Sequence, residues 1–140
     1  MSTDRVFVDT NVVLSGLLFR GNEAKVLNLA LKGRVRLVLA EAVVIEAREV
    51  LANKFPEKQD EFEDFLNEVD CELVPYPDEA ELENVSGVVR DPDDVPVLAS
   101  ILRSKPHVAL TGDKDLLTEQ VRAIAPVCTC AEYLRRLESH

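Results

Sequence analysis

The sequence lacks several features that would assign it to a membrane, secreted or repeat class. No apolar stretch approaches the roughly 18 to 20 residues of a membrane-spanning helix, and the first residues do not have a signal-peptide profile. Internal repeats and low-complexity segments are also missing. The three cysteines are an odd number, so we expect reduced thiols that pack as small core residues. Together these absences favour a soluble, cytoplasmic protein with no membrane contact.

What the chain does contain is enough apolar material for one substantial core. It has 140 residues, of which 46% are hydrophobic, and this predicts a single domain over residues 1–140. The net charge of −10 argues at first against a polyanionic partner such as RNA. The charge is uneven, however, at +3 over residues 1–40, −14 over 41–94 and +1 over 95–140. A nucleic acid could therefore meet the two terminal thirds, provided that cations cover any carboxylate cluster between them.

Apolar runs alternate with stretches of helical periodicity along the whole chain. Strands that alternate with helices predict a mostly parallel sheet of about four to five strands, covered on both faces in a three-layer α/β/α arrangement. Residues 78–90 are mostly polar and give no firm assignment. The strands are expected at 6–8, 36–40, 71–74, 107–111 and 127–130, and the helices at 12–19, 22–32, 41–52, 57–69, 94–103, 113 or 114 to 123, and 131–137.

Two acidic residues follow expected strands at the place where such sheets bind ligands. Asp9 comes directly after the first strand, and Asp113 comes two residues after the strand at 107–111. Ligands of open parallel sheets bind beyond the carboxyl ends of the strands, where the strand order reverses. If these two strands are neighbours, both carboxylates reach one edge. Helix capping is the alternative for Asp9, and Thr10 and Asn11 are also cap-type residues.

The Asp-Pro-Asp-Asp turn at 91–94 adds a third acidic position. Asp91 or Asp93 can cap the helix that follows. With Asp93 as the cap, Pro96 falls in the first helical turn, where a missing N–H is tolerated, and Asp94 is free to point toward the strand ends.

Two more acids need a choice between site and support. On a helical wheel Glu46 lies about 40° from Val50, at the edge of the apolar face of its helix. Asp113 is favoured over Asp115 as a site residue because Gly112 before it would let a ligand approach. Asp115 is then expected to support the helix N-terminus.

Four motifs in this order resemble the PIN-domain family over residues 5 to about 133. They are Val-Asp-Thr-Asn at 8–11, Glu46, Asp-Pro-Asp-Asp at 91–94 and Thr-Gly-Asp-Lys-Asp at 111–115. The chain looks most like the bacterial and archaeal branch related to VapC-type toxins of toxin–antitoxin pairs. This resemblance implies a metal-dependent endoribonuclease that hydrolyses RNA phosphodiester bonds, with an antitoxin protein as a partner.

The resemblance also implies a site made of carboxylates. Several carboxylates held close together cannot all ionise without compensation, so the metal-free site should have raised pKa values. Ligands that are all oxygen favour one or two Mg²⁺ or Mn²⁺ ions. The implied catalytic and metal-binding residues are Asp9, Glu46, Asp94 and Asp113, with Asn11, Asp93, Thr111 and Asp115 in support.

Other functional classes fit less well, and one stays open. A haloacid-dehalogenase-type phosphotransferase needs a second Asp two residues after the first, where this chain has Asn11, and a receiver domain needs an Asp that residues 71–77 do not supply. The open alternative is a catalytically weak or inactive PIN-like module that binds RNA or a protein. Two departures favour it: Val95-Pro96 could rotate Asp94, and the acids of 75–90 would repel RNA. Apolar helices such as 12–18 could also support a homodimer.

Overall fold

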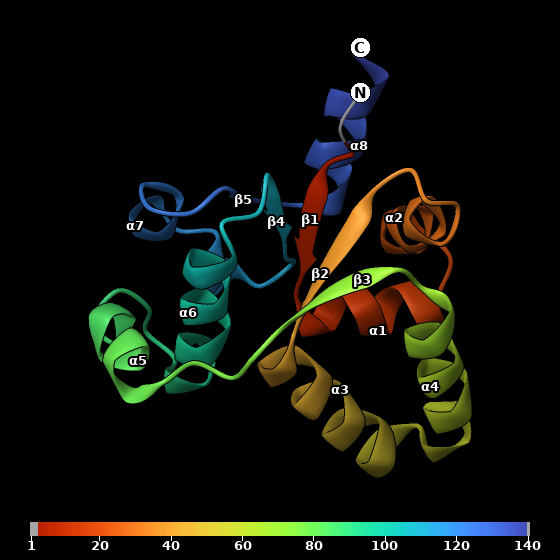
Figure 1. The fold of residues 1–140 in the computed structure, drawn as a ribbon, viewed down its shortest axis with the longest axis horizontal. Helices are drawn as coiled ribbons and strands as arrows, with labels where there is room; N and C mark the ends of the chain where they lie inside the picture. The colour runs from red at the N-terminus through yellow and green to blue at the C-terminus, as the bar shows by residue number, and fades with distance from the viewer. Residues whose placement is uncertain (1–2, 140) are drawn as a thin grey trace.

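The computed structural model describes residues 3–139, and within them five strands and eight α-helices alternate (Figure 1). The strands are β1 (Arg5–Val8), β2 (Arg36–Ala40), β3 (Cys71–Val74), β4 (Val108–Leu110) and β5 (Val127–Cys128). The helices are α1 (Thr10–Leu18), α2 (Asn22–Leu31), α3 (Glu41–Lys54), α4 (Gln59–Glu68), α5 (Glu79–Val85), α6 (Val95–Ser104), α7 (Glu119–Arg122) and α8 (Cys130–Glu138). Short 3₁₀ turns lie at Pro56–Lys58, Pro92–Asp94 and Lys114–Leu116.

All five strands pair in parallel, in the order β3-β2-β1-β4-β5. The chain builds outward from β1 to β2 and β3, and then crosses back to place β4 on the other side of β1. Phe7 of β1 therefore has Val38 of β2 on one side and Ala109 of β4 on the other. The reversal of strand order lies between β1 and β4, so the carboxyl ends of these two strands form the expected ligand-binding edge.

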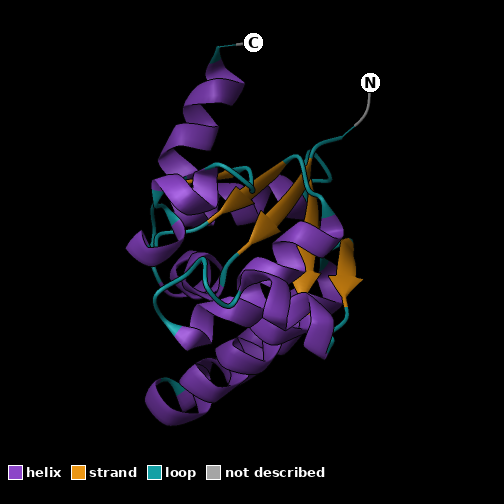
Figure 2. Cartoon of the chain, turned by 90° about the vertical axis from the view of Figure 1, so that its left-hand side faces the viewer, coloured by secondary structure: helices purple, strands orange, loops and turns teal. Residues whose placement is uncertain are grey.

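Helices cover both faces of the sheet, which confirms the predicted three-layer α/β/α architecture (Figure 2). Helix α1 packs against α2 and α3, and α2 packs against α8. Helix α6 packs against β2 and against α5. In Figure 1 the helices α3, α4 and α5 lie on the lower side of the view, and the start of β1 lies near α8 at the top.

The central strand β1 shows why apolar runs without alternation predicted this fold. Val6, Phe7 and Val8 are each 0% exposed, because a parallel strand covered on both faces must be apolar on both. The predicted strands at 36–40 and 71–74 are confirmed residue for residue. Among the described residues, no helix combines the length and apolarity that a membrane crossing requires.

Two helix starts differ from the sequence prediction, and a cap explains each. Helix α1 begins at Thr10, two residues earlier than expected, because Asp9 is its N-cap and accepts a hydrogen bond from the Thr10 N–H. At the acidic turn Asp91, and not Asp93, is the one of the two candidate caps that acts as a cap. Its side chain accepts the Asp93 N–H at 2.9 Å and caps a 3₁₀ turn, so α6 begins only at Val95, without a side-chain cap of its own.

The third difference is the stretch after β4, which is not one helix. The Thr118 hydroxyl accepts the Val121 N–H and so opens the short α7, after a separate 3₁₀ turn at Lys114–Leu116. The segment without a firm assignment contains α5, which starts with a reciprocal capping box between Asp78 and Glu81. This box occupies the Asp-x-x-Glu spacing that marks a helix start.

Candidate functional site

The carboxylate of Asp9 lies buried at the carboxyl end of β1, with its residue 7% exposed. One oxygen accepts the Thr10 N–H at 2.7 Å, and the other accepts the Thr111 hydroxyl at 2.7 Å. The Asp9 N–H donates to the Leu110 carbonyl of β4. Asp9 is therefore both the cap of α1 and a fixed carboxylate at the point where the strand order reverses.

Thr111 connects this carboxylate to the loop after β4. Its hydroxyl donates to Asp9 and accepts the Asp113 N–H at 3.0 Å, and the side chain is buried. Asn11 makes a second connection between the strand ends, because its side-chain oxygen accepts the Gly112 N–H at 3.2 Å. The two loops are thus held together by side chains of the first and last predicted motifs.

Asp94 is the second buried acid of the site, and it is bonded differently. The residue is 8% exposed, and its buried Oδ2 atom has no hydrogen-bond partner. Asp91, Asp94 and Asp115 each offer a carboxylate oxygen, and these oxygens all lie within 4.8 Å of one another. Asp115 also pairs with Arg90 at 3.0 Å. Asp94 therefore belongs to an acid triplet and also has an oxygen that the protein itself does not satisfy.

The electrostatics join Asp9, Asp94 and Asp113 into one acidic group. Burial, followed by the charge and hydrogen bonding of Asp113, raises the pKa of Asp94 to about 7. Burial also raises the pKa of Asp9, while hydrogen bonds from Thr111 and Thr10 oppose the rise and the charge of Asp113 adds to it. The raised pKa values agree with the expectation for crowded carboxylates without a bound cation.

Glu46 lies on the exposed rim of this group instead of in its buried centre. Partial burial, then the charge of Asp9, raises its pKa, and the nearby Thr10 hydroxyl lowers it. The Thr10 hydroxyl, itself buried, makes no close hydrogen bond. Glu46 and Asp93 also line a cavity of about 450 Å³ between α3 and the start of α6. A ligand in that cavity would meet an acidic wall.

The structure thus brings the predicted residues to one edge of the sheet, with different degrees of burial. Asp9 and Asp94 are buried, Asp113 is half-buried, and Glu46 is on the rim. Asp91, expected only as a helix cap, is an addition to the predicted group. Asp115, expected to support a helix N-terminus, also lies beside Asp94. The spacing Asp91-x-x-Asp94 was a visible signal, since one helical turn brings such residues together.

The donor set fits a hard divalent cation. The nearby ligand atoms are carboxylate, hydroxyl and amide oxygens, which are the ligands that Mg²⁺ and Mn²⁺ prefer. A buried carboxylate oxygen without a partner is costly unless a cation or a proton satisfies it. Asp94 meets this description, and Asp91 and Asp115 stand beside it. The three cysteines and His107 lie outside the acid group.

Comparisons with known proteins agree with this arrangement. One solved structure similar to this chain is VapBC2 from Rickettsia felis bound to a promoter DNA fragment. The sequence identity is 12% and the TM-score is 0.67, and the match covers 89% of this chain and 98% of that chain. FitAcB from Neisseria gonorrhoeae is also similar, with 17% identity, 90% and 98% coverage, and a TM-score of 0.60. At these identities the likeness shows a shared fold. No curated protein matches the sequence.

The sequence itself carries the stronger result. The family model of the PIN domain matches residues 5–115, which include the strand-end acid Asp9, Glu46 and both later acidic motifs. This match confirms the resemblance to the PIN-domain family that the four motifs indicated. The chain belongs to the PIN-domain family.

Proposed function

We propose that the protein is a Mg²⁺- or Mn²⁺-dependent endoribonuclease and the toxin component of a toxin–antitoxin pair. The proposal treats residues 1–140 as one domain that acts on RNA in the cytoplasm and is held inactive by an antitoxin protein. It rests on membership of the PIN-domain family and on the acid group at the carboxyl ends of β1 and β4.

One observation carries the proposal: Asp94, a member of the acid triplet, has a buried Oδ2 atom without a hydrogen-bond partner. A carboxylate in a purely structural role would have its oxygens satisfied by N–H or O–H groups, as Asp9 has. Stability alone would favour a neutral side chain at this position. A function that needs a cation explains why an acid stands there.

The contacts of the acids and of Thr111 support a separate role for each. Asp94, with Asp91, Asp113 and Asp115 near it, would hold the cation, and Asp9 would complete the ligand set. When bound, the cation would supply a more acidic water and charge stabilisation for phosphodiester hydrolysis. Thr111 keeps the Asp9 carboxylate in place by donating to it, and also holds the backbone at Asp113.

The neighbourhood of the acid group offers contacts for RNA despite the negative net charge. Arg90 and Lys114 are both exposed, and Arg90 pairs with Asp115 at the edge of the group. A polar cavity of about 340 Å³ adjoins Asn11, Thr111 and Gly112, and side chains with amide, hydroxyl and carboxylate groups line it. These surfaces could bind a phosphate and a base on either side of the scissile bond.

The deciding experiment is cleavage of defined single-stranded RNAs by the purified protein. We expect cleavage with Mn²⁺ or Mg²⁺, none with a chelator, and restoration when the ion is added back. The Asp94→Asn variant should remain folded and not cleave. Cleavage that a chelator leaves unchanged would rule out the metal-dependent mechanism.

A thermal-shift measurement separates the enzyme from the inactive binding module. Binding of a cation to the folded state raises the melting temperature by mass action. We expect Mn²⁺ to raise it for the natural protein and to have no effect on Asp94→Asn. If Mn²⁺ shifts neither protein and no RNA is cut, the alternative of a non-catalytic module is correct.

A further inference from the structure

The two edge strands of the sheet, β3 and β5, differ in length. At the β5 edge the strand is only two residues long, Val127 and Cys128, and both are buried. At the other edge β3 runs over four residues, and within residues 3–139 no strand pairs with its outer side. Edge strands are commonly protected by lysine, proline or extreme shortness. Within its four residues β3 has no lysine and no proline.

Apolar side chains are exposed beside this open edge. Leu73 in the middle of β3 is 69% exposed, the largest value among the exposed large apolar residues of the described chain. Tyr76 just after the strand is 45% exposed. We call Leu73 and Tyr76, with the outer edge of β3, the β3 surface. Apolar exposure of this kind next to a free strand edge is typical of an interaction site.

A cavity lies next to Leu73, between β3, α3 and α4. Its volume is about 570 Å³, and its walls include Val44, Leu66, Cys71 and Leu73. Leu73 and Cys71 point to the same side because side chains two apart on a strand share a face. An extended chain paired with β3 would place every second side chain on this same side, where the cavity could take an apolar one.

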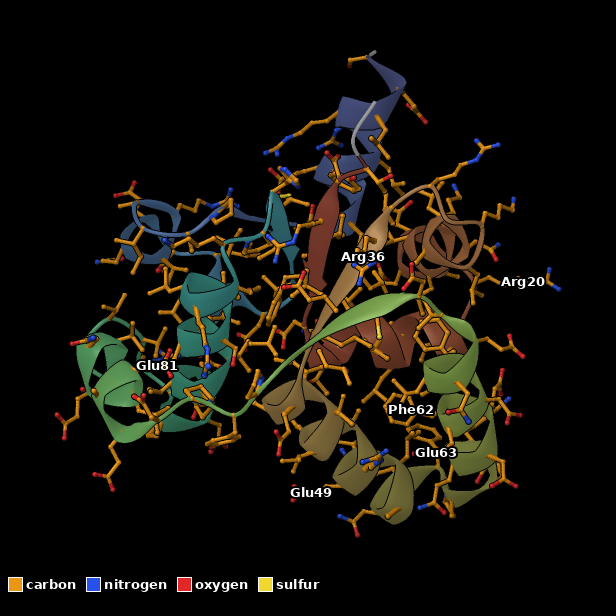
Figure 3. All side chains as sticks on the ribbon, viewed as in Figure 1. Arg20, Arg36, Glu49, Phe62, Glu63 and Glu81 are labelled. Carbon is orange, nitrogen blue, oxygen red and sulfur yellow. The ribbon has the colours of Figure 1, made fainter. Side chains whose placement is uncertain are left out.

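The charge around the β3 surface indicates the chemistry of its partner. Helix α4, which borders the cavity, carries five acidic residues and no basic one, and Figure 3 labels one of these acids, Glu63. Glu41 also lines the cavity. The arginines Arg48 and Arg36 are already paired, with Glu63 at 2.8 Å and Asp70 at 3.3 Å. Each of these ion pairs also uses one acid, so the negative charge that remains comes from Glu41 in the cavity lining and from the acids of α4 that have no arginine partner.

We propose that the β3 surface binds an extended, basic segment of a partner protein, which adds a strand to the outer edge of β3. Backbone hydrogen bonds to β3 supply the register, an apolar side chain of the segment enters the cavity beside Leu73, and lysine or arginine side chains face α3 and α4. A second copy of this chain is disfavoured as the occupant, because it would bring two acidic surfaces together. No catalytic step enters this proposal, so its test and the ribonuclease test succeed or fail separately.

The test uses a fluorescent peptide of about seven residues with threonine at every odd position, valine at the central position and lysine two residues before and after it. In a paired strand the valine and both lysines then share the face that meets the cavity, α3 and α4. We expect saturable binding by fluorescence anisotropy. An otherwise identical peptide with alternate backbone amides N-methylated should not bind, because it cannot pair. Leu73→Ser should weaken binding by about tenfold, as loss of one buried leucine contact predicts. The matched control Ile124→Ser, at a residue 47% exposed elsewhere, should change binding less than about twofold.

Cys71 provides a readout at the site itself. It lines the cavity and is partly exposed, whereas Cys128 and Cys130 are buried. Bound peptide should therefore slow maleimide labelling of Cys71. Equal binding of the N-methylated peptide, or unchanged Cys71 labelling at saturation, would overturn the proposal in favour of diffuse charge attraction. A dimer in sedimentation that Leu73→Ser dissociates would instead identify a second copy as the occupant.

Discussion

Asp9 and Asp94 are buried to nearly the same extent, yet the protein treats their carboxylates in opposite ways. Asp9 is 7% exposed and each of its oxygens accepts a hydrogen bond. Asp94 is 8% exposed, and its buried Oδ2 accepts none. Burial raises the pKa of both acids most, and the charge of Asp113 adds to both rises. Hydrogen bonds from Thr111 and Thr10 oppose the rise for Asp9, whereas the hydrogen bonding of Asp113 increases it further for Asp94.

The difference separates a carboxylate that supports the fold, Asp9, from one that is available to a ligand, Asp94. Asp9 caps α1 and joins β1 to the loop after β4, so the fold itself uses its charge. Asp94 performs no such duty, because Asp91 is the cap of that turn. A charge that the fold does not use and does not satisfy is expected where a ligand will arrive. Replacing each acid by its amide should therefore have different effects at the two positions.

The largest effect is expected on RNA cleavage. Asp94→Asn and Asp9→Asn should each lower the Mn²⁺-dependent rate by roughly 10²-fold or more, because each removes a negative ligand from the proposed cation site. Cleavage of a defined RNA, followed by gel electrophoresis, measures this. The control is Glu138→Gln, an exposed acid at the end of α8 and well beyond the acid motifs in the chain, which should cleave normally. Normal cleavage by either Asp variant would remove that residue from the site.

Much of the acid group was predictable because strand ends are local signals. An apolar run that stops at Asp9, and another that stops before Gly112, mark two carboxyl ends without any knowledge of the tertiary structure. Their meeting depends on β1 and β4 being neighbours, which the sequence does not encode locally. The strand order follows from how the helices pack on both faces, and so only the structure confirms it.

Cap assignments were less predictable because neighbouring residues compete with equal chemistry. Asp91 and Asp93 are the same residue type, and the choice depends on the backbone of the 3₁₀ turn that Pro92 opens. The missing partner of Asp94 could not be predicted either, since it depends on what surrounds the side chain in space. The capping box of α5, by contrast, has a local signal in the sequence, the spacing of Asp78 and Glu81.

The next largest difference is expected in the metal-free stability of the Asp94→Asn and Asp9→Asn variants. At pH 8 Asp94→Asn should raise the free energy of unfolding by about 1–3 kcal/mol, because it removes a buried charge and its amide can donate to Asp113. Asp9→Asn should lower it, since Thr10 N–H and the Thr111 hydroxyl both donate to Asp9 and an amide has one acceptor oxygen. Urea denaturation measures both. Equal shifts in the two variants would contradict the comparison.

The pH dependence of stability gives a smaller and more specific test. The folded-state pKa of Asp94 is raised from 3.8 to about 7, so the folded protein binds more protons than the unfolded chain between these values. This stabilising contribution is complete below pH 4 and is lost as the pH rises to about 7. The metal-free melting temperature should therefore fall from pH 5 to pH 7.5, and fall less in Asp94→Asn. An identical slope in the variant would show that Asp94 is not the titrating group.

The smallest effect concerns Thr111, which belongs to the satisfied side of the comparison. Thr111→Val removes the donor to Asp9 and the acceptor of the Asp113 N–H while keeping the shape of the side chain. We expect a loss of about 1 kcal/mol in unfolding free energy and a several-fold slower cleavage, because Asp9 loses a fixed orientation and not its charge. Thr111→Ser keeps the hydroxyl and should restore both. Since Asp94 is untouched, the Mn²⁺-induced rise in melting temperature should persist in Thr111→Val. Its disappearance would mean that Thr111 acts on cation binding and not only on the position of Asp9.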